Sequence, residues 1–431
     1  MFQNPKYRLE KGLQTLNWAE NGDCVLRSED MEESRREKIF KMSAELVADI
    51  AVDFKRYLYS EVDWDCRLVC IKGARGVGKT TMLLQRIAEM PNPDDALYVS
   101  LDNVWIDARE AYSLAEYHVA HGGTHLFIDE VHKLENWQDL VKSLNDNLRR
   151  LKVVYSGSSL LKLEKRGGDL SRRQTPYTLD GLSFREYLKF EGVADIQPFS
   201  LDDILSNHVA IARSISRKFP VLAHFDAYRI GGYYPFYKEE PRHYLNRIVA
   251  TANQVLEVDY PEIEDVEPMT IRKARRMLNV LAMSAPLTPN MDRLYRELGT
   301  DRKQGLKMLY ALERAGLLSL LTTASKESLK NLPTPDKIYC SNTNLMRALV
   351  ALPNPGTMRE TFFLNQLRHE HGVTYPAKGD FLVDGKYLFE VGGAGKGFDQ
   401  IKDLPDSFVV NDDTTVGFGN KLPLWLFGFL Y

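Results

Sequence analysis

The chain has 431 residues, of which 44% are hydrophobic and 27% are charged, and its formal net charge is −3. A chain of this length is expected to form roughly two to four domains. The composition excludes global disorder, because enough apolar side chains are present to bury several cores. The nearly balanced charge excludes an overall basic footprint, so a nucleic-acid partner would have to be met by a local basic patch.

The four cysteines predict a reduced, intracellular protein, because they are scattered and form neither a CxxC pair nor a zinc-ligand spacing. The first residues lack the apolar core of a signal peptide. Apolar stretches such as Leu424–Leu430 are too short to span a bilayer. We therefore expect a cytoplasmic protein without a membrane partner.

Residues 1–60 form a charged segment with a helical pattern. From Ser34 to Tyr59, apolar residues recur every three or four positions, which predicts an amphipathic helix. The segment Asp63-Trp64-Asp65 ends this pattern, and the residues before it carry no motif that assigns them a role.

From Arg67 onward, apolar strands alternate with helices. The predicted strands are Arg67–Lys72, Ala96–Leu101, His125–Asp129 and Leu151–Ser156, and the predicted helices are Thr80–Met90, Ala108–His121 and Trp137–Arg150. This alternation is typical of βαβ units, in which helices cover both faces of a parallel sheet. The sequence therefore predicts the α/β class, with such a core at residues 61–190.

Residues 73–80 read Gly-Ala-Arg-Gly-Val-Gly-Lys-Thr and match the Walker A pattern. In that pattern the glycines allow a tight turn, so that backbone N–H groups and a helix N-terminus point at phosphate oxygens. We expect Lys79 to reach the β- and γ-phosphates of ATP and Thr80 to bind Mg²⁺. The predicted nucleotide-binding set is Gly73, Ala74, Arg75, Gly76, Val77, Gly78, Lys79, Thr80 and Thr81. The alternative is a glycine turn with a chance Lys-Thr pair, which the preceding strand and the following helix disfavour.

An apolar strand delivers the acidic pair Asp129-Glu130 about fifty residues after the phosphate loop. Ligands of open α/β sheets bind at the carboxyl ends of the strands. We expect Asp129 to hold Mg²⁺, and Glu130 to orient and deprotonate the attacking water as the catalytic base beside Lys79. The alternative is a pair of solvated carboxylates at a strand end.

Two further groups are candidates for nucleotide sensing. Ser156 and Ser158 follow the strand at Val153, where a hydroxyl could contact the γ-phosphate, although serine also favours turns. Arg172 and Arg173 lie in a predicted loop, and one of them could act as an arginine finger towards a neighbouring site in a homo-oligomer. The alternative for this pair is a solvated basic patch.

The combined motifs resemble a known family. The loop GxxxxGKT, then LFIDEVHKLENW, VVYSGSSLL and TLDGLSFREYL, is similar to AAA+-type prokaryotic ATPases whose P-loop domain precedes a DUF4143-like region. These ATPases lie near the archaeal ATPases and the STAND NTPases, and the resemblance covers roughly residues 60–431. It implies a P-loop NTPase core of the ASCE/AAA+ type, a helical lid, a winged helix and a small α/β restriction-endonuclease-like C-terminal domain.

The expected domains follow from this resemblance and from the helical patterns after Thr178. They are an N-terminal helical segment (1–60), the ATPase core (61–190), a helical lid (191–267), a winged helix (268–345) and the nuclease-like domain (346–431). Predicted lid helices are Leu201–Ala223 and Pro241–Glu257, followed by an acidic linker at Asp259–Pro268. Within the lid, Gly231, Gly232 and Pro235 resemble the family's glycine–proline motif, which lies against the nucleotide.

Residues 291–317 have the pattern of a helix–turn–helix, with a strong second helix at Asp301–Arg314. A winged helix places its second helix in the DNA major groove. Arg302, Lys303 and Lys307 are therefore candidates for contacts with double-stranded DNA. Leu306, Leu309, Tyr310 and Leu312 are explained by core packing alone, and winged helices also bind proteins, so a protein partner stays open.

The end of the chain is similar to the PD-(D/E)XK nuclease arrangement. Glu360 falls on a predicted helix (Arg359–His371), and Asp380 and Glu390 fall at the start and end of predicted strands. Such carboxylates could hold a divalent cation. The expected Glu-x-Lys is absent, because Glu390 is followed by Val391-Gly392, although Lys396 or Lys402 could substitute. The alternative is a degenerate fold without nuclease activity.

The sequence thus predicts an Mg²⁺-dependent ATPase coupled to DNA or to a protein through its C-terminal domains. One alternative is a STAND-like signalling switch that binds ATP and hydrolyses it slowly. The other is a metal-dependent DNA nuclease regulated by the ATPase.

Overall fold

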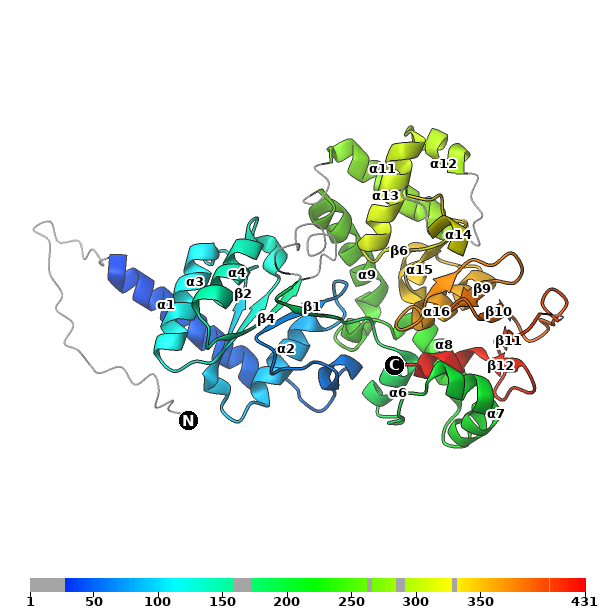
Figure 1. Cartoon of the computed structure of the whole chain (residues 1–431), viewed down its shortest axis with the longest axis horizontal. Helices are drawn as coiled ribbons and strands as arrows, with labels where there is room; N and C mark the ends of the chain where they lie inside the picture. The colour runs from blue at the N-terminus through cyan, green and yellow to red at the C-terminus, as the bar shows by residue number, and fades with distance from the viewer. Residues whose placement is uncertain are drawn as a thin grey trace, which may run out of the picture.

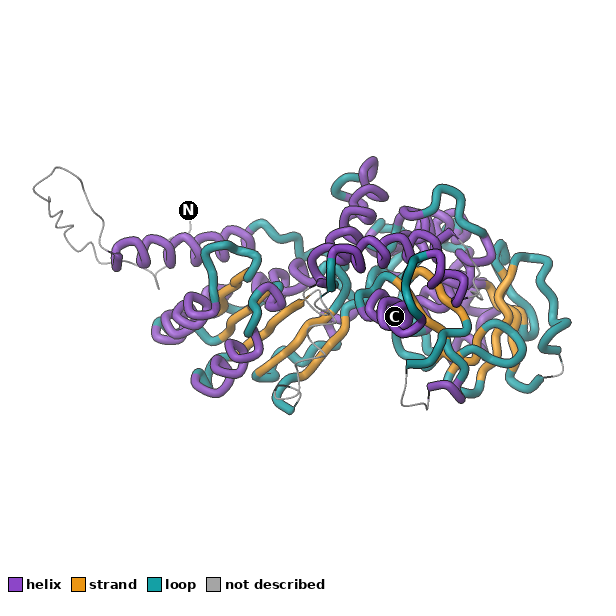
Figure 2. The backbone as a smooth tube through the Cα atoms, turned by 90° about the horizontal axis from the view of Figure 1, so that it is seen from above, coloured by secondary structure: helices purple, strands orange, loops and turns teal. Residues whose placement is uncertain are grey.

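The computed structural model describes residues 28–157, 170, 172–261, 266–283, 291–327, 332–402 and 404–431. Figure 1 shows an elongated molecule, with a parallel sheet and its helices at one end and a larger mixed half at the other. Figure 2 shows the same division from above, with α1 (Ser28–Ala48) running along the end that holds the parallel sheet. In the described parts of the chain, no helix is long and apolar enough to cross a bilayer.

The described residues of the first half form a five-stranded sheet in the order β2-β3-β4-β1-β5, in which every neighbouring pair is parallel. Its strands are β1 (Leu68–Lys72), β2 (Ala96–Ser100), β3 (His125–Asp129), β4 (Lys152–Gly157) and β5 (Thr175–Thr178). The fold is the α/β P-loop NTPase class, as predicted. Strand β5 is an addition to the prediction, because Thr-Pro-Tyr-Thr contains no apolar run and lies at the sheet edge.

Three helices connect and cover these strands, namely α2 (Lys79–Ala88), α3 (Ala108–Ala120) and α4 (Trp137–Asn147). The predicted N-terminal helix is wrong at its C-terminal end, because α1 stops at Ala48 instead of continuing to Tyr59. The chain beyond α1 is held by Gln85, whose side-chain amide donates to the carbonyl oxygens of Ala51 and Phe54 at 2.8 Å each. The helical spacing of apolar residues continues past Ala48, but these tertiary hydrogen bonds hold the chain in a non-helical conformation there.

A helical segment follows β5. It contains α6 (Phe184–Phe190), α7 (Leu201–Ser216), α8 (Val221–Gly231), α9 (Tyr244–Gln254) and the π-helical turn η7 (Val255–Asp259). The single helix predicted for Leu201–Ala223 is wrong. The chain forms two helices there because Pro220 has no N–H group and cannot continue the first. The predicted linker is also wrong at its start, since Asp259 is buried at the end of η7.

Next come α11 (Pro268–Met283), α12 (Met291–Glu297), α13 (Arg302–Arg314), α14 (Ala324–Glu327) and α15 (Thr343–Leu349), with the antiparallel pair β6 (Leu318–Leu321) and β7 (Lys337–Cys340). The Asp301 carboxylate caps α13 by accepting from the backbone N–H of Gln304 at 2.9 Å. The predicted second helix is therefore present. The assignment of this region as a winged helix stays a prediction.

The last part of the chain forms a second sheet, with the order β12-β11-β10-β9-β8 among its described strands. They are β8 (Val373–Thr374), β9 (Phe381–Val383), β10 (Tyr387–Gly392), β11 (Ser407–Asn411) and β12 (Lys421–Pro423), and α16 (Pro355–Leu367) packs against β10. The apolar run at Leu422–Leu430 suggests a further strand, but only its first two residues belong to β12, and Leu424–Phe429 is a 3-10 helix. Its side chains are all buried, and a short apolar run does not distinguish a buried strand from a buried helix.

The two halves share one hydrophobic core. A single cluster of buried side chains extends from Val69 and Ile71 of β1, through Phe184 and Tyr228, to Phe363 and Phe427. The second half therefore packs directly against the face of the parallel sheet that carries α2. Because the core is continuous, the domain boundaries given above stay proposals.

Candidate functional site

The phosphate loop joins β1 to α2, and its glycines occupy positions that other residues would strain. Gly76 has φ 79° and Gly78 has φ 99°, both in the left-handed region that favours glycine. Gly73 has no such angle, but a Cβ atom there would lie 2.4 Å from the carbonyl oxygen of Leu179. The conformation and close packing of the loop therefore require glycine at these positions, whether or not a ligand is bound.

Lys79 begins α2 and is buried beneath the loop. Its ammonium donates to the carbonyl oxygens of Gly73 and Ala74 at 3.0 Å each. Burial lowers the pKa of Lys79, while the nearby carboxylates of Glu130 and Asp129 act in the opposite direction. Thr80 and Thr81 follow it on the exposed start of the helix, beside the loop N–H groups. This cradle fits the polyphosphate of a nucleotide.

Asp129 links three strands and the phosphate loop. Its Oδ2 accepts from the Thr80 hydroxyl at 2.5 Å and from the Tyr98 hydroxyl at 2.9 Å. Its Oδ1 accepts from the Ser156 hydroxyl and from the backbone N–H of Glu130. The structure thus brings together the predicted Mg²⁺ ligands Thr80 and Asp129. Their hydroxyl and carboxylate oxygens are the hard donors that Mg²⁺ prefers beside substrate phosphates.

Glu130 follows Asp129 with φ 54°, a left-handed backbone that is uncommon outside glycine and is often found at functional sites. Its Oε2 lies 3.1 Å from Nδ1 of His132, whose ring is completely buried. The buried imidazole of His132 therefore lies within ion-pair distance of the Glu130 carboxylate. His132 is a neighbour of the proposed base to which the sequence analysis assigned no role.

The candidate sensor serines and the candidate arginine-finger residues differ in where the structure places them. Ser156 ends β4 and is buried against Asp129, so it lies at the site. Ser158 lies outside the described residues. Arg172 and Arg173 precede β5, at the sheet edge opposite the phosphate loop, and Arg173 forms an ion pair with Asp146 of α4. Neither arginine lies at this chain's own phosphate loop, and a role at a neighbouring site stays a prediction.

Residues of the predicted lid segment contact the phosphate loop. A Cβ atom on Gly76 would lie 2.6 Å from the Phe236 ring, and one on Gly78 would lie 3.7 Å from the Pro235 ring. Gly232 also needs its small size, since a Cβ atom there would lie 2.7 Å from the rings of Tyr187 and Tyr228. Gly231 has no such requirement, because a Cβ atom there would make only an ordinary van der Waals contact with the Tyr244 ring at 3.7 Å. Of the glycine–proline motif, Pro235 therefore lies against the phosphate loop, while Gly231 and Gly232 pack against tyrosine rings.

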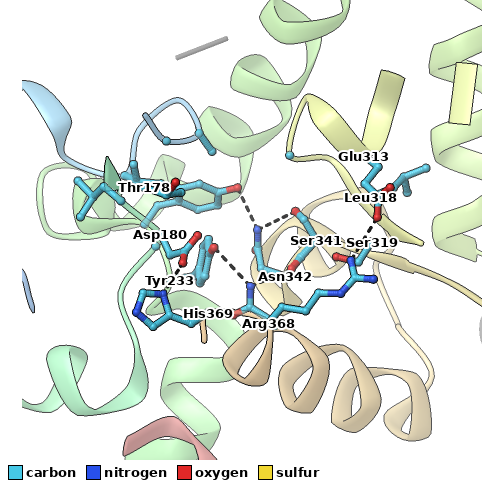
Figure 3. A pocket seen from close by; sticks show the side chains of 18 residues that line it. Thr178, Asp180, Tyr233, Glu313, Leu318, Ser319, Ser341, Asn342, Arg368 and His369 are labelled. Carbon is cyan, nitrogen blue, oxygen red and sulfur yellow. Dashed lines mark hydrogen bonds and ion pairs between the residues drawn. The ribbon is translucent and has the colours of Figure 1, made fainter. Parts of the chain in front are cut away.

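A pocket of about 200 Å³ opens beside the start of the phosphate loop. Figure 3 shows that its walls come from distant segments: Thr178 at the end of β5 and Asp180 after it, Tyr233 after α8, and Arg368 and His369 directly after α16. The Asp180 carboxylate lies 2.8 Å from Nδ1 of His369. The pocket thus lies at the junction between the half with the parallel sheet and the C-terminal half.

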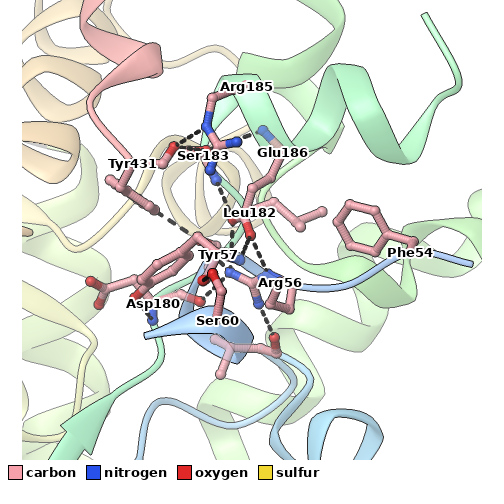
Figure 4. Close-up of polar contacts among 12 residues, drawn as sticks. Phe54, Arg56, Tyr57, Ser60, Asp180, Leu182, Ser183, Arg185, Glu186 and Tyr431 are labelled. Carbon is pink, nitrogen blue, oxygen red and sulfur yellow. Dashed lines mark hydrogen bonds and ion pairs between the residues drawn. The ribbon is translucent and has the colours of Figure 1, made fainter. Parts of the chain in front are cut away.

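Arg56 joins the chain preceding β1 to this junction (Figure 4). Its buried guanidinium donates to both carboxylate oxygens of Glu186 at 3.0 Å each and to the carbonyl oxygens of Asp180 and Gly181. It also donates to the carbonyl oxygen of Val77 in the phosphate loop. One side chain therefore connects the loop, the end of β5 and helix α6.

The candidate DNA-binding residues Arg302, Lys303 and Lys307 are exposed along α13. Around them, residues 268–314 contain ten Lys or Arg residues and only four Asp or Glu residues. This is a local basic segment in a chain whose net charge is −3. Met308, Leu309 and other apolar residues of α13 are buried, as the core-packing alternative also requires.

The nuclease-like carboxylates are brought together, but lysines neutralise them. Lys337 of β7 lies 3.2 Å from Oε2 of Glu360 and 3.0 Å from Oδ1 of Asp380, and Lys396 forms an ion pair with Glu390. Burial raises the pKa of Glu360, with the charge of Asp380 adding to the effect. Among the described residues, no group of three His, Cys, Asp or Glu side chains is arranged to hold a metal ion. Nuclease activity stays an untested prediction.

Several residues near the site belong to no sequence motif that assigns them a role. Tyr98, His132, Arg56, Phe236 and Asp259 reach the loop or the acidic pair only through the fold. His132 follows the acidic pair closely, which is a weak sequence signal. Asp259 is far along the chain, in a segment whose composition is that of a linker.

Two family models match parts of the chain. The model described as AAA domain matches residues 65–188, which contain the phosphate loop, Asp129 and Glu130. A second, described as a domain of unknown function (DUF8612), matches residues 222–356. Neither match concerns DUF4143, so that part of the resemblance stays a prediction.

Two curated relatives come from Methanocaldococcus jannaschii. Uncharacterized protein MJ1637 is 26% identical over 293 residues, which are 63% of this chain and 61% of that protein. Uncharacterized protein MJ1544 is 31% identical over 135 residues, which are 29% of each. The chain thus spans about three fifths of the first relative and less than a third of the second.

Solved structures give partial matches. The S. cerevisiae Hsp104-ADP complex is 19% identical, with coverage of 66% of this chain and 41% of that chain and a TM-score of 0.26. AMPPCP-bound DnaA from Aquifex aeolicus is 14% identical, with coverage of 64% and 87% and a TM-score of 0.23. Scores of this size describe local likeness rather than a shared overall arrangement.

Proposed function

Because residues 65–188 match the AAA-domain model, we propose that the chain binds ATP with Mg²⁺ and hydrolyses it, and that it couples this reaction to double-stranded DNA. The observation that carries the proposal is the convergence of Lys79, Thr80, Asp129 and Glu130 at one edge of the sheet. The Thr80 hydroxyl and the Asp129 carboxylate are in contact at 2.5 Å, although 49 residues separate them.

Each of these residues has a defined task in hydrolysis. The loop N–H groups and Lys79 would bind the phosphates, and Thr80 with Asp129 would hold Mg²⁺, which neutralises phosphate charge when it is bound. Glu130 would accept a proton from the attacking water. Nδ1 of His132 lies 3.1 Å from one carboxylate oxygen of Glu130, and this contact would help to position the base.

The coupling to DNA is supported by the basic segment at residues 268–314 and by its connection to the phosphate loop. Gly316 follows α13, and a Cβ atom there would lie 3.5 Å from that of Ala74 in the loop. A movement of the loop would therefore reach α13 directly. The same contact supports a second candidate, a nucleotide switch of the STAND type, in which ATP binding alone alters the C-terminal half.

ATP turnover by the purified chain, with and without double-stranded DNA, tests the proposal. We expect turnover that DNA stimulates, no nucleotide binding by Lys79→Ala, and retained binding without turnover by Glu130→Gln. Removal of a catalytic base of this kind lowers turnover by about 10²- to 10⁴-fold. Equal turnover by wild type and Glu130→Gln would refute the mechanism, and binding without turnover in the wild type would favour the switch.

The DNA interface has a matched control on the same chain. The triple variant Arg302→Ala, Lys303→Ala, Lys307→Ala removes three exposed charges from α13, and the control Arg213→Ala, Arg217→Ala, Lys218→Ala removes three from α7 and its end. Figure 1 shows that α7 and α13 lie at opposite ends of the C-terminal half. We expect weaker DNA binding only for the first variant, with a salt dependence shallower by about 0.9 in log–log slope per lost phosphate contact. Equal binding by both variants would move the search to a protein partner.

A further inference from the structure

Arg75 lies inside the phosphate loop, yet its side chain is held by the lid. The guanidinium makes a two-pronged contact with Asp259, with Nη2 2.7 Å from Oδ1 and Nε 2.9 Å from Oδ2. Only 11% of the Arg75 side chain and 3% of the Asp259 side chain are exposed. A desolvated, bidentate pair of this kind is among the stronger polar contacts in proteins.

The same guanidinium approaches the residue that would activate water. Nη2 of Arg75 lies 3.5 Å from Nε2 of His132, whose other ring nitrogen lies 3.1 Å from the Glu130 carboxylate. The first of these contacts is too long for a strong hydrogen bond, so Arg75 is held mainly by Asp259. Its position next to His132 and Glu130 places it on the γ-phosphate side of the site, because Glu130 must face that phosphate to act.

Asp259 lies at the end of the π-helical turn η7, which continues α9. Turns of this type are rare and occur frequently at functional sites. The turn contacts α11, and its Glu257 forms an ion pair with Arg275 of that helix. Figure 1 places α9 between the parallel sheet and helices α11 and α13. The partner of Arg75 is therefore attached to the basic helical segment.

We propose that Arg75 is the residue by which this site distinguishes a nucleoside triphosphate from a diphosphate. Asp259 and the γ-phosphate compete for its guanidinium. Without nucleotide, Arg75 pairs with the lid; with a triphosphate, its guanidinium turns to the γ-phosphate. An arginine fork binds a terminal phosphate in two-pronged fashion, and a diphosphate lacks that group. The inference rests on the proposed ATP site and adds the basis of its selectivity.

The competition also explains how the lid would respond to the bound nucleotide. When Arg75 leaves Asp259, a buried carboxylate loses its partner, and the lid must move to return it to water or to another cation. A diphosphate leaves the pair intact. The lid position, and α11 with it, thus differs between the two nucleotide states.

Equilibrium binding of a non-hydrolysable ATP analogue and of ADP, each with Mg²⁺, tests the inference on the full chain. We expect Arg75→Gln to weaken binding of the ATP analogue by about 10- to 100-fold, as for a lost charge-assisted hydrogen bond, and ADP binding by less than about twofold. Asp259→Asn keeps the shape of the side chain and removes its charge, and it should tighten binding of the analogue. The control Arg359→Gln removes a similar partly buried arginine that pairs with Asp412 at 2.9 Å, and it should change neither affinity.

The outcomes separate the inference from the proposed function. If the wild type binds both nucleotides and Arg75→Gln weakens both equally, Arg75 only shapes the loop and the inference is wrong. An unchanged affinity of Asp259→Asn for the analogue would refute the competition. A folded wild type that binds neither nucleotide would overturn the proposed ATP site itself.

Discussion

Arg56 shows how a residue without a motif becomes central to the structure. Five of its hydrogen bonds reach Val77, Asp180, Gly181 and both oxygens of Glu186. Glu186 in turn accepts from the backbone N–H of Tyr57 at 2.6 Å, and it forms a capping box with Ser183 at the start of α6. In the sequence this arginine is one basic residue among many, because nothing local marks its burial.

Replacement of Arg56 by leucine is expected to destabilise the protein by about 3–5 kcal/mol, because it leaves the buried Glu186 carboxylate without a compensating charge. Denaturant unfolding followed by tryptophan fluorescence measures this loss. The double variant Arg56→Leu, Glu186→Leu removes both charges, so it should be more stable than the single variant. A control at the surface pair of half-buried Lys152 and exposed Asp65, Lys152→Leu, should change the unfolding midpoint far less. A double variant less stable than the single one would contradict this account.

At the scale of elements, the sequence predicted those whose signal is local. Strand β1, the glycine loop and α2 follow one another with clear apolar runs and turn residues, and β3 ends in an unmistakable acidic pair. Elements determined by tertiary contacts were not predictable. The end of α1 depends on hydrogen bonds from Gln85, and β5 has no apolar pattern because it borders the sheet. The long-range pairing of Arg75 with Asp259 has no sequence signal at all.

The lid–loop contact makes a prediction at the element scale. Gly76→Ala should weaken nucleotide binding by at least about tenfold, because the new methyl group overlaps the Phe236 ring and the backbone is left-handed. Gly122→Ala is a matched control, since Gly122 has φ 87° with nothing within 4 Å of the added Cβ atom. That variant should lose about 1–2 kcal/mol of unfolding free energy, because alanine is strained in the left-handed region. It should bind nucleotide normally. Titration with a fluorescent ATP analogue measures both. Normal binding by Gly76→Ala would show that the lid does not hold the loop in solution.

For the whole molecule, the main finding is that the C-terminal half touches the phosphate loop. The pocket beside the phosphate loop is lined by Gly73 and Ala74 of the loop and by Gly316 after α13. Lys79 now donates to the carbonyl oxygens of Gly73 and Ala74. A bound polyphosphate would compete for this ammonium and release both carbonyl groups. We therefore expect nucleotide binding to displace the segment that contacts Gly316.

A disulfide between positions 74 and 316 tests this displacement. The two Cβ positions are 3.5 Å apart, within the range that a disulfide spans. Gly316 has φ 73°, so a cysteine there bears the strain of a left-handed residue, which the single variant Gly316→Cys measures separately. The double variant Ala74→Cys, Gly316→Cys should therefore cross-link on mild oxidation without nucleotide, as measured by mobility on non-reducing gels. An ATP analogue should slow the reaction, because it moves Ala74 away from Gly316. The single-cysteine variants control for reactions of the native thiols.

The cross-link also separates binding from coupling within one molecule. If the loop transmits the nucleotide state to α13, the oxidised double variant should lose DNA stimulation of ATP turnover, and reduction of the disulfide should restore it. Comparison of the oxidised and reduced forms cancels any direct effect of the cysteine at position 74 on nucleotide binding. A cross-link that forms equally fast with and without the analogue, and that leaves DNA stimulation unchanged, would show that Gly316 rests on the loop without reporting its state. The route from nucleotide to DNA would then have to run through Asp259 and α11 instead.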